Sequence, residues 1–381
     1  MTYKNPNTIK QKLIPVSAPF ISDLEVEYAA RAVKSGFISG SSGEYITQFE
    51  ELFAKFCNTK FGVSCASGTA ALQLAVRAAG IKSGDEVIVP TFTNIASVLC
   101  VIYAGAKPVL VDAREDTWCM DERLVNEKLT MRTRAIIPVH IYGHPVKMDT
   151  IMDIAKERNL VVIEDAAEAH GGLFNGKVLG GIGDMGCFSF YANKIITTGE
   201  GGMIVTNNAK YAEKMKSLRN LAFGDVKRYL HIDLGYNYRL TNVQAAIGVA
   251  QMQRVNEFVE KKREIASWYN GALGKIDGVT LPCEMPWAKN VYWMYGILIG
   301  DEFGLGRDEL MKKLREKGID TRSFFVPMQN QPVFNSLGLF KNDKCPVSDR
   351  ISKMGLYLPS GIGLTRKEVD YVCNVIKDLS K

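Results

Sequence analysis

The first two-thirds of the chain alternate short apolar runs with amphipathic stretches, and this alternation constrains the fold more than any other feature. Short apolar runs bounded by turns are typical of strands buried on both faces, and apolar residues at helical spacing are typical of covering helices. The sequence therefore predicts an α/β fold built from βα units around a mostly parallel sheet. The expected strands are 86–89, 108–111, 135–139, 161–164, 186–190 and 203–206, and the expected helices are 69–79, 97–104, 148–158 and 209–221.

The pattern changes after Thr241. Residues 242 to about 273 predict one long helix, with apolar residues at helical spacing and charged residues on the other face. This helix leads into a smaller α+β region, for which we expect a strand at 291–299 and helices at 307–317 and 366–379. We therefore expect a large domain over 1–250, including the N-terminal segment, and a small C-terminal domain over 251–381.

Composition excludes several classes of protein. The chain of 381 residues is 46% apolar and 23% charged, which is ordinary for a folded globular protein. Its net charge of +6 is spread along the sequence, so we expect an anionic small substrate rather than a nucleic-acid partner. We expect neither a signal peptide nor a membrane span. The eight scattered cysteines predict free thiols in a reducing cytoplasm, without a metal site.

Lys194 and Asp165 form the most informative pair of polar residues. Asp165 ends the apolar run 160–165, and Lys194 lies between an expected strand and the glycine-rich turn 197–202. A pyridoxal phosphate (PLP) site needs this pair, because the lysine bonds covalently to the cofactor aldehyde and the aspartate keeps the pyridine nitrogen protonated. The alternatives are a surface lysine and a helix-capping aspartate. Two isoleucines follow Lys194, which is not the pattern of a solvated helix face.

Small polar residues could bind the phosphate of such a cofactor. Ser67, Gly68 and Thr69 precede an expected helix, where free backbone N–H groups and the helix dipole favour an anion. An ordinary N-cap is the alternative interpretation. Ser189, at the end of an expected strand, could donate to the same phosphate. The loop 35–43, rich in glycine and serine, is expected near the site because glycine lets the backbone approach a ligand.

Three further residues could lie around the cofactor ring. Phe92 follows an expected buried strand and could stack on the ring, because ligands bind at the carboxyl ends of parallel strands. A core phenylalanine is an equal alternative. Glu168 could reach the ring hydroxyl or a water near it. His170 could line the same wall, but a core histidine is the favoured interpretation.

Six ordered motifs resemble the DegT/DnrJ/EryC1/StrS family of PLP-dependent nucleotide-sugar aminotransferases, and the resemblance extends from Pro15 to the C-terminal helix. It implies the aspartate aminotransferase fold (PLP fold type I), with a mostly parallel sheet of the seven-stranded type and a smaller C-terminal α+β domain. The motifs are 67–69, 84–90, 138–143, 164–169, 183–191 and 198–202.

The resemblance also implies partners and further site residues. It implies a homodimer with shared active sites, in which Asn237 of one subunit reaches the phosphate of the other site. Arg239 would lie nearby and take a carboxylate of the amino donor. Arg322, Phe324 and Phe325 are further candidates for substrate contacts at the rim of the site, and core packing is an equal alternative for the two phenylalanines. Gln329 is also an expected substrate contact, although it departs from the histidine expected at its position.

Within the family, five segments are most similar to members that act on a GDP-linked sugar. Such members transfer the amino group of L-glutamate to the 4-keto carbon of GDP-4-keto-6-deoxy-D-mannose, in the synthesis of surface polysaccharides such as O-antigen. Glu168, where many members have glutamine, favours this branch. The segments are 142–145, 164–168, 193–203, 235–242 and 321–328.

Three other functions stay open at this point. An aminotransferase for a UDP- or dTDP-linked keto sugar would need the same core and different rim residues. A related sugar 3-dehydratase would carry histidine in place of Lys194, so the lysine argues against this lyase. A non-catalytic regulator or scaffold would not need the complete set of Asp165, Ser189 and Lys194.

Overall fold

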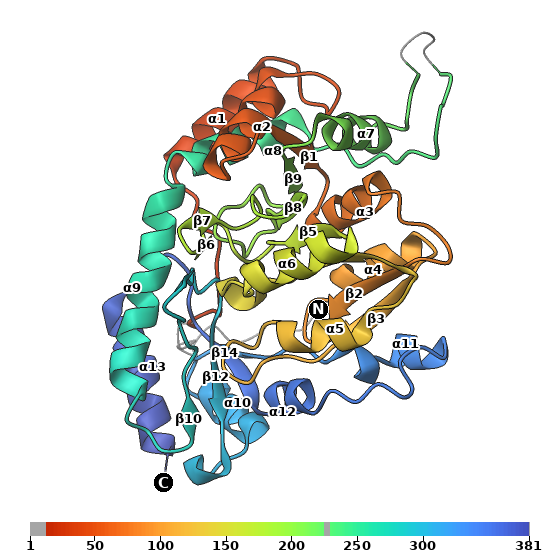
Figure 1. The fold of residues 1–381 in the computed structure, drawn as a ribbon. Helices are drawn as coiled ribbons and strands as arrows, with labels where there is room; N and C mark the ends of the chain where they lie inside the picture. Colours follow the sequence, from red (N-terminus) through yellow and green to blue (C-terminus); the bar gives the residue numbers. More distant parts are fainter. Residues whose placement is uncertain (1–12, 225–228, 381) are drawn as a thin grey trace, which may run out of the picture.

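A seven-stranded sheet forms the centre of the structure, a computed structural model that describes residues 13–224 and 229–380 (Figure 1). The strand order is β1–β9–β8–β5–β4–β2–β3. The five strands from β8 to β3 run parallel, and β9 is antiparallel to both of its neighbours. This mixed, mostly parallel sheet confirms the predicted α/β class. The strands are β1 Phe61–Cys65, β2 Glu86–Pro90, β3 Lys107–Val111, β4 Thr133–Ile136, β5 Val161–Asp165, β8 Met185–Ser189 and β9 Gly202–Thr206.

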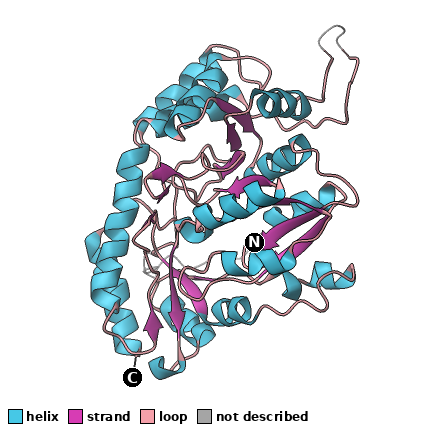
Figure 2. Ribbon diagram, viewed as in Figure 1, coloured by secondary structure: helices cyan, strands magenta, loops and turns pink. Residues whose placement is uncertain are grey.

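Helices cover both faces of this sheet, which explains why its strands are apolar on both sides (Figure 2). In β2, Val87 and Val89 join the core under α3, α4 and α7, whereas Ile88 joins the core under α2, α6 and α8. The first set is α3 Gly68–Ala78, α4 Ala96–Tyr103 and α7 Ala209–Arg219; the second is α2 Glu44–Phe56, α6 Met148–Arg158 and α8 Asn242–Met252, with the short α5 Val125–Lys128 beside it.

The predicted long helix over 242–273 is wrong in one respect, because it is two helices, α8 and α9 Val255–Leu273. The chain turns at Gln253 and Arg254. The Arg254 guanidinium bonds to Glu25 at 2.8 Å, and the Gln253 amide donates to the Tyr28 hydroxyl at 2.8 Å. Both partners belong to α1 Asp23–Lys34, so packing against that helix accompanies the break.

A second sheet forms the lower part of the molecule in Figure 1. Its order is β10–β12–β14–β13, and every pair is antiparallel. Together with α9, α10 and α13 it encloses a separate apolar core. The elements are β10 Val279–Thr280, β12 Tyr295–Ile299, β13 Arg322–Ser323, β14 Gly355–Leu358, α10 Arg307–Glu316, α11 Pro332–Ser336, α12 Pro346–Met354 and α13 Arg366–Leu379.

The strand expected at 291–299 begins only at Tyr295. Tyr292 has a left-handed backbone, with φ of 47°, which a strand does not allow. The side chain of Asn290 accepts a hydrogen bond from the Tyr292 N–H at 2.8 Å and so stabilises this turn. A small third sheet lies nearby and consists of β6 Leu173–Phe174, β7 Lys177–Val178 and β11 Ala288–Lys289.

The predicted domain boundary stays a prediction. Ala250 lies inside α8, and the segment near the N-terminus joins the apolar core of the C-terminal part, where Ile14 bridges to Ile319 ahead of β13. Residues 1–12, for which we expect no signal peptide, lie outside the described residues. Over 13–224 and 229–380, the structure has no helix that is both long and apolar enough to cross a bilayer.

Candidate active site

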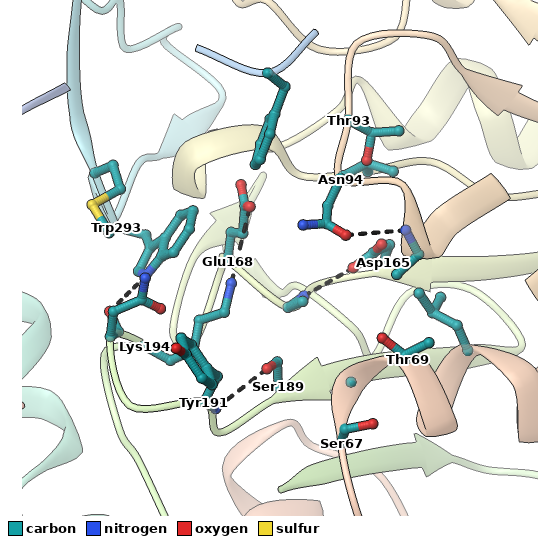
Figure 3. A pocket seen from close by; sticks show the side chains of 18 of the residues that line it. Ser67, Thr69, Thr93, Asn94, Asp165, Glu168, Ser189, Tyr191, Lys194 and Trp293 are labelled. Atoms are coloured by element: carbon teal, nitrogen blue, oxygen red, sulfur yellow. Dashed lines mark hydrogen bonds and ion pairs between the residues drawn. The ribbon is translucent and has the colours of Figure 1, made fainter. Parts of the chain in front are cut away.

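A pocket lies at the edge of the large sheet where β1, β2, β5 and β8 end (Figure 3). These carboxyl ends meet because β2, β5 and β8 are parallel and β1 has the same direction as β8. The opposite side of the pocket, which we call the outer wall, consists of Trp293, Arg322 and Tyr357 from β13, β14 and the segment before β12. The sheet-side lining includes Ser67, Gly68, Thr69, Thr93, Asn94, Asp165, Glu168, Ser189, Tyr191 and Lys194.

Gly68, Thr69 and Ser189 form what we call the phosphate cradle. Gly68 opens α3, and within the described residues its amide and that of Thr69 have no hydrogen-bond partner. A Cβ on Gly68 would lie 2.8 Å from the Ser189 Cβ, so only glycine leaves this close approach open. Ser67 is the N-cap, because its hydroxyl accepts from the Ala70 N–H at 3.1 Å. The Ser67 hydroxyl therefore caps the helix, while the amides of Gly68 and Thr69 stay available to an anion.

Asp165 points into the pocket from the end of β5, and it is only 5% exposed. Its carboxylate accepts hydrogen bonds from the Ser97 hydroxyl at 2.7 Å and from the Ala167 N–H at 3.2 Å. Burial raises the pKa of Asp165, and these two hydrogen bonds offset the rise only in part. A buried carboxylate of this kind favours a further cationic N–H donor, which a pyridinium supplies.

Glu168 lies beside Lys194 in the same pocket (Figure 3). The Tyr142 N–H donates to Glu168 Oε2 at 2.7 Å, and burial raises the pKa of this carboxyl. Tyr142 has a left-handed backbone with φ of 54°, and Gly143 follows with φ of 103°. A Cβ on Gly143 would lie 2.7 Å from Val291 Cγ2, so this turn packs directly against the segment before β12.

The side chain of Lys194 is only 10% exposed, and its amine lies between a carboxylate and an indole ring. Its Nζ is 4.0 Å from Glu168 Oε1 and 3.7 Å from the centroid of the Trp293 ring. Burial lowers the pKa of the Lys194 amine, although the carboxylates of Glu168 and Asp165 act in the opposite direction. A buried amine of this kind is a better nucleophile and proton carrier than a solvated lysine.

These residues fit pyridoxal phosphate. The cradle offers amides and a hydroxyl to a phosphate, Asp165 offers a carboxylate to a ring nitrogen, and Lys194 offers an amine to an aldehyde.

Several predicted contacts do not line this pocket. Phe92 is 1% exposed and packs its ring against those of Tyr142 and Phe324, which is the core interpretation of this residue. Phe324 is also buried in this aromatic cluster. The side-chain amide of Gln329 makes two hydrogen bonds within the chain. Its oxygen accepts from the Thr91 hydroxyl, and its nitrogen donates to the Asp349 carboxylate.

Arg322 is exposed at the rim of the pocket, as a substrate contact requires. Asn237 and Arg239 lie elsewhere. Asn237 bridges to Asn220, and the Arg239 guanidinium donates to the Asn220 side chain at 2.8 Å. The roles expected for these three residues stay predictions.

His170 and the loop 35–43 do not line the pocket. His170 is fully buried among the rings of Phe53, Phe188 and Phe190, in agreement with the core interpretation. The loop 35–43 contacts the start of α8, where the Asn242 side chain donates to Phe37 O at 2.6 Å.

The sequence interpretation missed Ser97, Asn94, Tyr357 and Trp293. Ser97 had a detectable signal, because a hydroxyl in the first turn of a helix after β2 lies at the ligand-binding edge of a parallel sheet. Trp293 had none, since its place in the pocket depends on the turn at Tyr292 and on the packing of the second sheet.

Comparisons with known proteins agree with this geometry. The model of the DegT/DnrJ/EryC1/StrS aminotransferase family matches residues 19–377. The chain is 42% identical over 360 residues to the GDP-perosamine synthase of Caulobacter vibrioides, covering 94% of this chain and 96% of that protein. It is 41% identical over 367 residues to the GDP-perosamine synthase of Escherichia coli O157:H7, covering 96% and 98%. The PLP form of the putative sugar aminotransferase Spr1654 from Streptococcus pneumoniae has a TM-score of 0.90 and 25% identity, covering 96% of this chain and 98% of that chain.

Proposed function

The chain belongs to the DegT/DnrJ/EryC1/StrS aminotransferase family and is a PLP-dependent aminotransferase, and we propose that it converts a GDP-4-keto-6-deoxy sugar to GDP-perosamine with L-glutamate as the amino donor. One observation carries the proposal: Lys194, Asp165 and the phosphate cradle converge on one pocket in a chain about 40% identical to two GDP-perosamine synthases.

The sheet side of the pocket binds the cofactor in this proposal. The amides of Gly68 and Thr69 and the hydroxyl of Ser189 hold its phosphate, and the N-terminal end of α3 adds the favourable helix dipole. Asp165 keeps the proton on the ring nitrogen. When bound, PLP supplies an electron sink for the carbon that bears the reacting amine.

Lys194 moves protons at the reacting carbon. Its amine is held at the end of a segment that is fixed by the Lys194 N–H bond to Tyr191 O at 2.9 Å. Because burial lowers the pKa of this amine, a larger share of it is neutral and able to accept a proton than in a solvated lysine. Glu168, 4.0 Å away, is the nearest carboxyl that can share that proton.

The outer wall receives the substrates. Arg322 presents a guanidinium at the exposed rim, and a guanidinium pairs with phosphate or carboxylate oxygens in two parallel hydrogen bonds. Phe325 and Tyr357 provide apolar surface beside it. An anionic nucleotide sugar and the dicarboxylate L-glutamate both suit such a rim.

The proposal includes a homodimer. Asn237 and Arg239 lie outside the pocket of their own chain, and in the proposal they serve the site of a second subunit. The segment 229–234 supports this idea, because several of its apolar side chains are strongly exposed and would be buried by a partner. These side chains are Tyr229, Leu230, Ile232 and Leu234.

We also place the reaction in the cytoplasm, in the synthesis of surface polysaccharides such as O-antigen. The eight cysteines support a reducing compartment, because all are free thiols and seven of them are buried.

Visible absorbance tests the reaction class. The purified protein with PLP should show the band of lysine-bound cofactor, and L-glutamate alone should convert it to the amine form of the cofactor. Addition of GDP-4-keto-6-deoxymannose should then restore the band. A band of lysine-bound cofactor that L-glutamate leaves unchanged would overturn the proposal.

A further inference from the structure

Trp293 contacts both the backbone before Lys194 and the lysine amine itself. Its indole N–H donates to Asn193 O at 2.8 Å, and the Lys194 Nζ lies 3.7 Å from the ring centroid. The indole is 5% exposed and belongs to the outer wall (Figure 3). One side chain therefore fixes the position of two consecutive residues in the segment that carries the reactive amine.

The backbone around Trp293 is held from two sides. Val291 N–H donates to Gly143 O at 3.2 Å, and the left-handed turn at Tyr292 is stabilised by Asn290. Gly143 follows Tyr142, whose N–H binds Glu168. The indole and the Glu168 carboxylate thus lie on two segments that contact each other, with the lysine amine between them.

The face of an indole ring is electron-rich and attracts a cation, most strongly when both are removed from water. The groups that face the amine are Glu168 and Asp165. His170, which burial keeps neutral by lowering its pKa to about 3, is also close enough to respond to the lysine charge. Burial acts against the charged amine, and the ring face and the two carboxylates favour it.

We propose that Trp293 is a positioning residue that holds the amine of Lys194 against its ring whenever that amine is not bonded to the cofactor. This inference rests on the proposed function, in which Lys194 is released during each half of the cycle. The released amine then waits on the indole beside Glu168, within reach of the pocket, and does not swing to solvent.

The test begins with the enzyme before PLP is added, so it does not depend on sugar turnover. The pH dependence of Lys194 labelling by an amine-reactive reagent, read by mass spectrometry, gives the pKa of this amine. Trp293→Leu removes the ring face, so the pKa should fall by about one unit. Trp293→Phe keeps a weaker ring face and should give a smaller fall. Trp287→Leu is the matched control, because Trp287 packs on His144 and Phe174 and does not contact Lys194.

A second readout uses the PLP-loaded enzyme. The conversion of the visible band by L-glutamate in a single turnover should be roughly tenfold slower in Trp293→Leu, and Trp293→Phe should recover part of the rate. A Lys194 pKa equal to that of the wild type in both variants would overturn the proposal, and Trp293→Phe decides alone if Trp293→Leu does not fold. Failure of the proposed function would instead appear in the wild type, as a band that L-glutamate does not change.

Discussion

The two sides of the pocket are built in different ways. On the sheet side, Asp165 is bonded through its N–H to Pro138 O at 2.9 Å and through its carbonyl to the His140 N–H at 3.1 Å, so its position follows from the sheet. On the outer wall, Arg322 is exposed on a two-residue strand. In the proposed function, the central sheet therefore positions the residues that bind the cofactor, and segments far along the chain position the residues that face the substrates.

The largest expected effect comes from the residue that both sides touch. Lys194→Ala removes covalent attachment of PLP and proton transfer together, so turnover should fall by at least about 10⁴-fold. The visible band of lysine-bound cofactor should disappear. Lys210→Ala, in which an exposed lysine is removed, is the control and should keep the band. Residual turnover above one-hundredth of the wild-type rate would contradict the role of Lys194.

Asp165→Asn tests the sheet side alone. Loss of the carboxylate should lower turnover by about 10²-fold or more, because the ring nitrogen loses its charged partner. Initial rates with saturating PLP measure this loss. A variant with nearly wild-type rates would show that another group protonates the ring.

Asp165→Asn should lower turnover but raise the stability of the protein without PLP. Because folding raises the pKa of Asp165, its carboxyl contributes full stability only below its unfolded pKa, and this stability is lost as the pH rises through the folded pKa. Asp165→Asn should therefore melt at a higher temperature than the wild type at pH 7, and the difference should vanish toward pH 4. Thermal melts across this pH range check the sign, and a variant that melts lower at pH 7 would contradict it.

Gly68→Ala tests the phosphate cradle. The new Cβ would meet the Ser189 Cβ at 2.8 Å, so we expect a stability cost of about 1–3 kcal/mol. We also expect PLP binding to weaken roughly tenfold, which a titration of the visible band would measure. Gly271→Ala in α9 is the control, since nothing lies within 4 Å of its added Cβ and alanine favours the helix. Equal PLP affinity in both variants would show that the cradle is not where the phosphate binds.

The smallest effect on catalysis should come from the outer wall. Arg322→Ala should raise KM for the nucleotide sugar about tenfold and leave kcat nearly unchanged, because it removes a charged hydrogen bond to bound substrate. The free energy of unfolding should change by less than about 0.5 kcal/mol, since the side chain is exposed. Steady-state kinetics measure KM and kcat separately. A substitution of Arg350, which forms an exposed surface ion pair with Glu115, is the control. A loss confined to kcat would place Arg322 in the chemistry instead.

Most of the central sheet was predictable, because buried parallel strands have continuous apolar sequences that lie between segments with helical periodicity. The exception in the central sheet was β1, where glycine and serine interrupt the apolar run 61–65. The break between α8 and α9 was not predictable, since both helices have helical periodicity. Contacts of Arg254 and Gln253 with α1 accompany that break, and such contacts appear only once the chain is folded.

In the site too, the residues with a local sequence signal were predictable and those placed by tertiary contacts were not. Lys194, Asp165 and Gly68 lie within or directly beside elements whose order is visible in the sequence. Trp293 reaches the amine through the left-handed turn at Tyr292 and the contact of its segment with the turn at Gly143, neither of which has a local sequence signal. Gln329 is a different case, because its side-chain amide is bonded to Thr91 and Asp349 within the chain, and its expected substrate contact stays a prediction.

A competition among nucleotide sugars tests the proposed substrate and the proposed reaction together. The PLP-loaded enzyme receives L-glutamate and equal amounts of GDP-, UDP- and dTDP-linked 4-keto-6-deoxy sugars, and mass spectrometry follows the exchange of the keto oxygen for an amino group. The proposed function predicts that the GDP-linked sugar is aminated first and that 2-oxoglutarate forms in equal amount. Preferential amination of the UDP- or dTDP-linked sugar, or no amination at all, would contradict it.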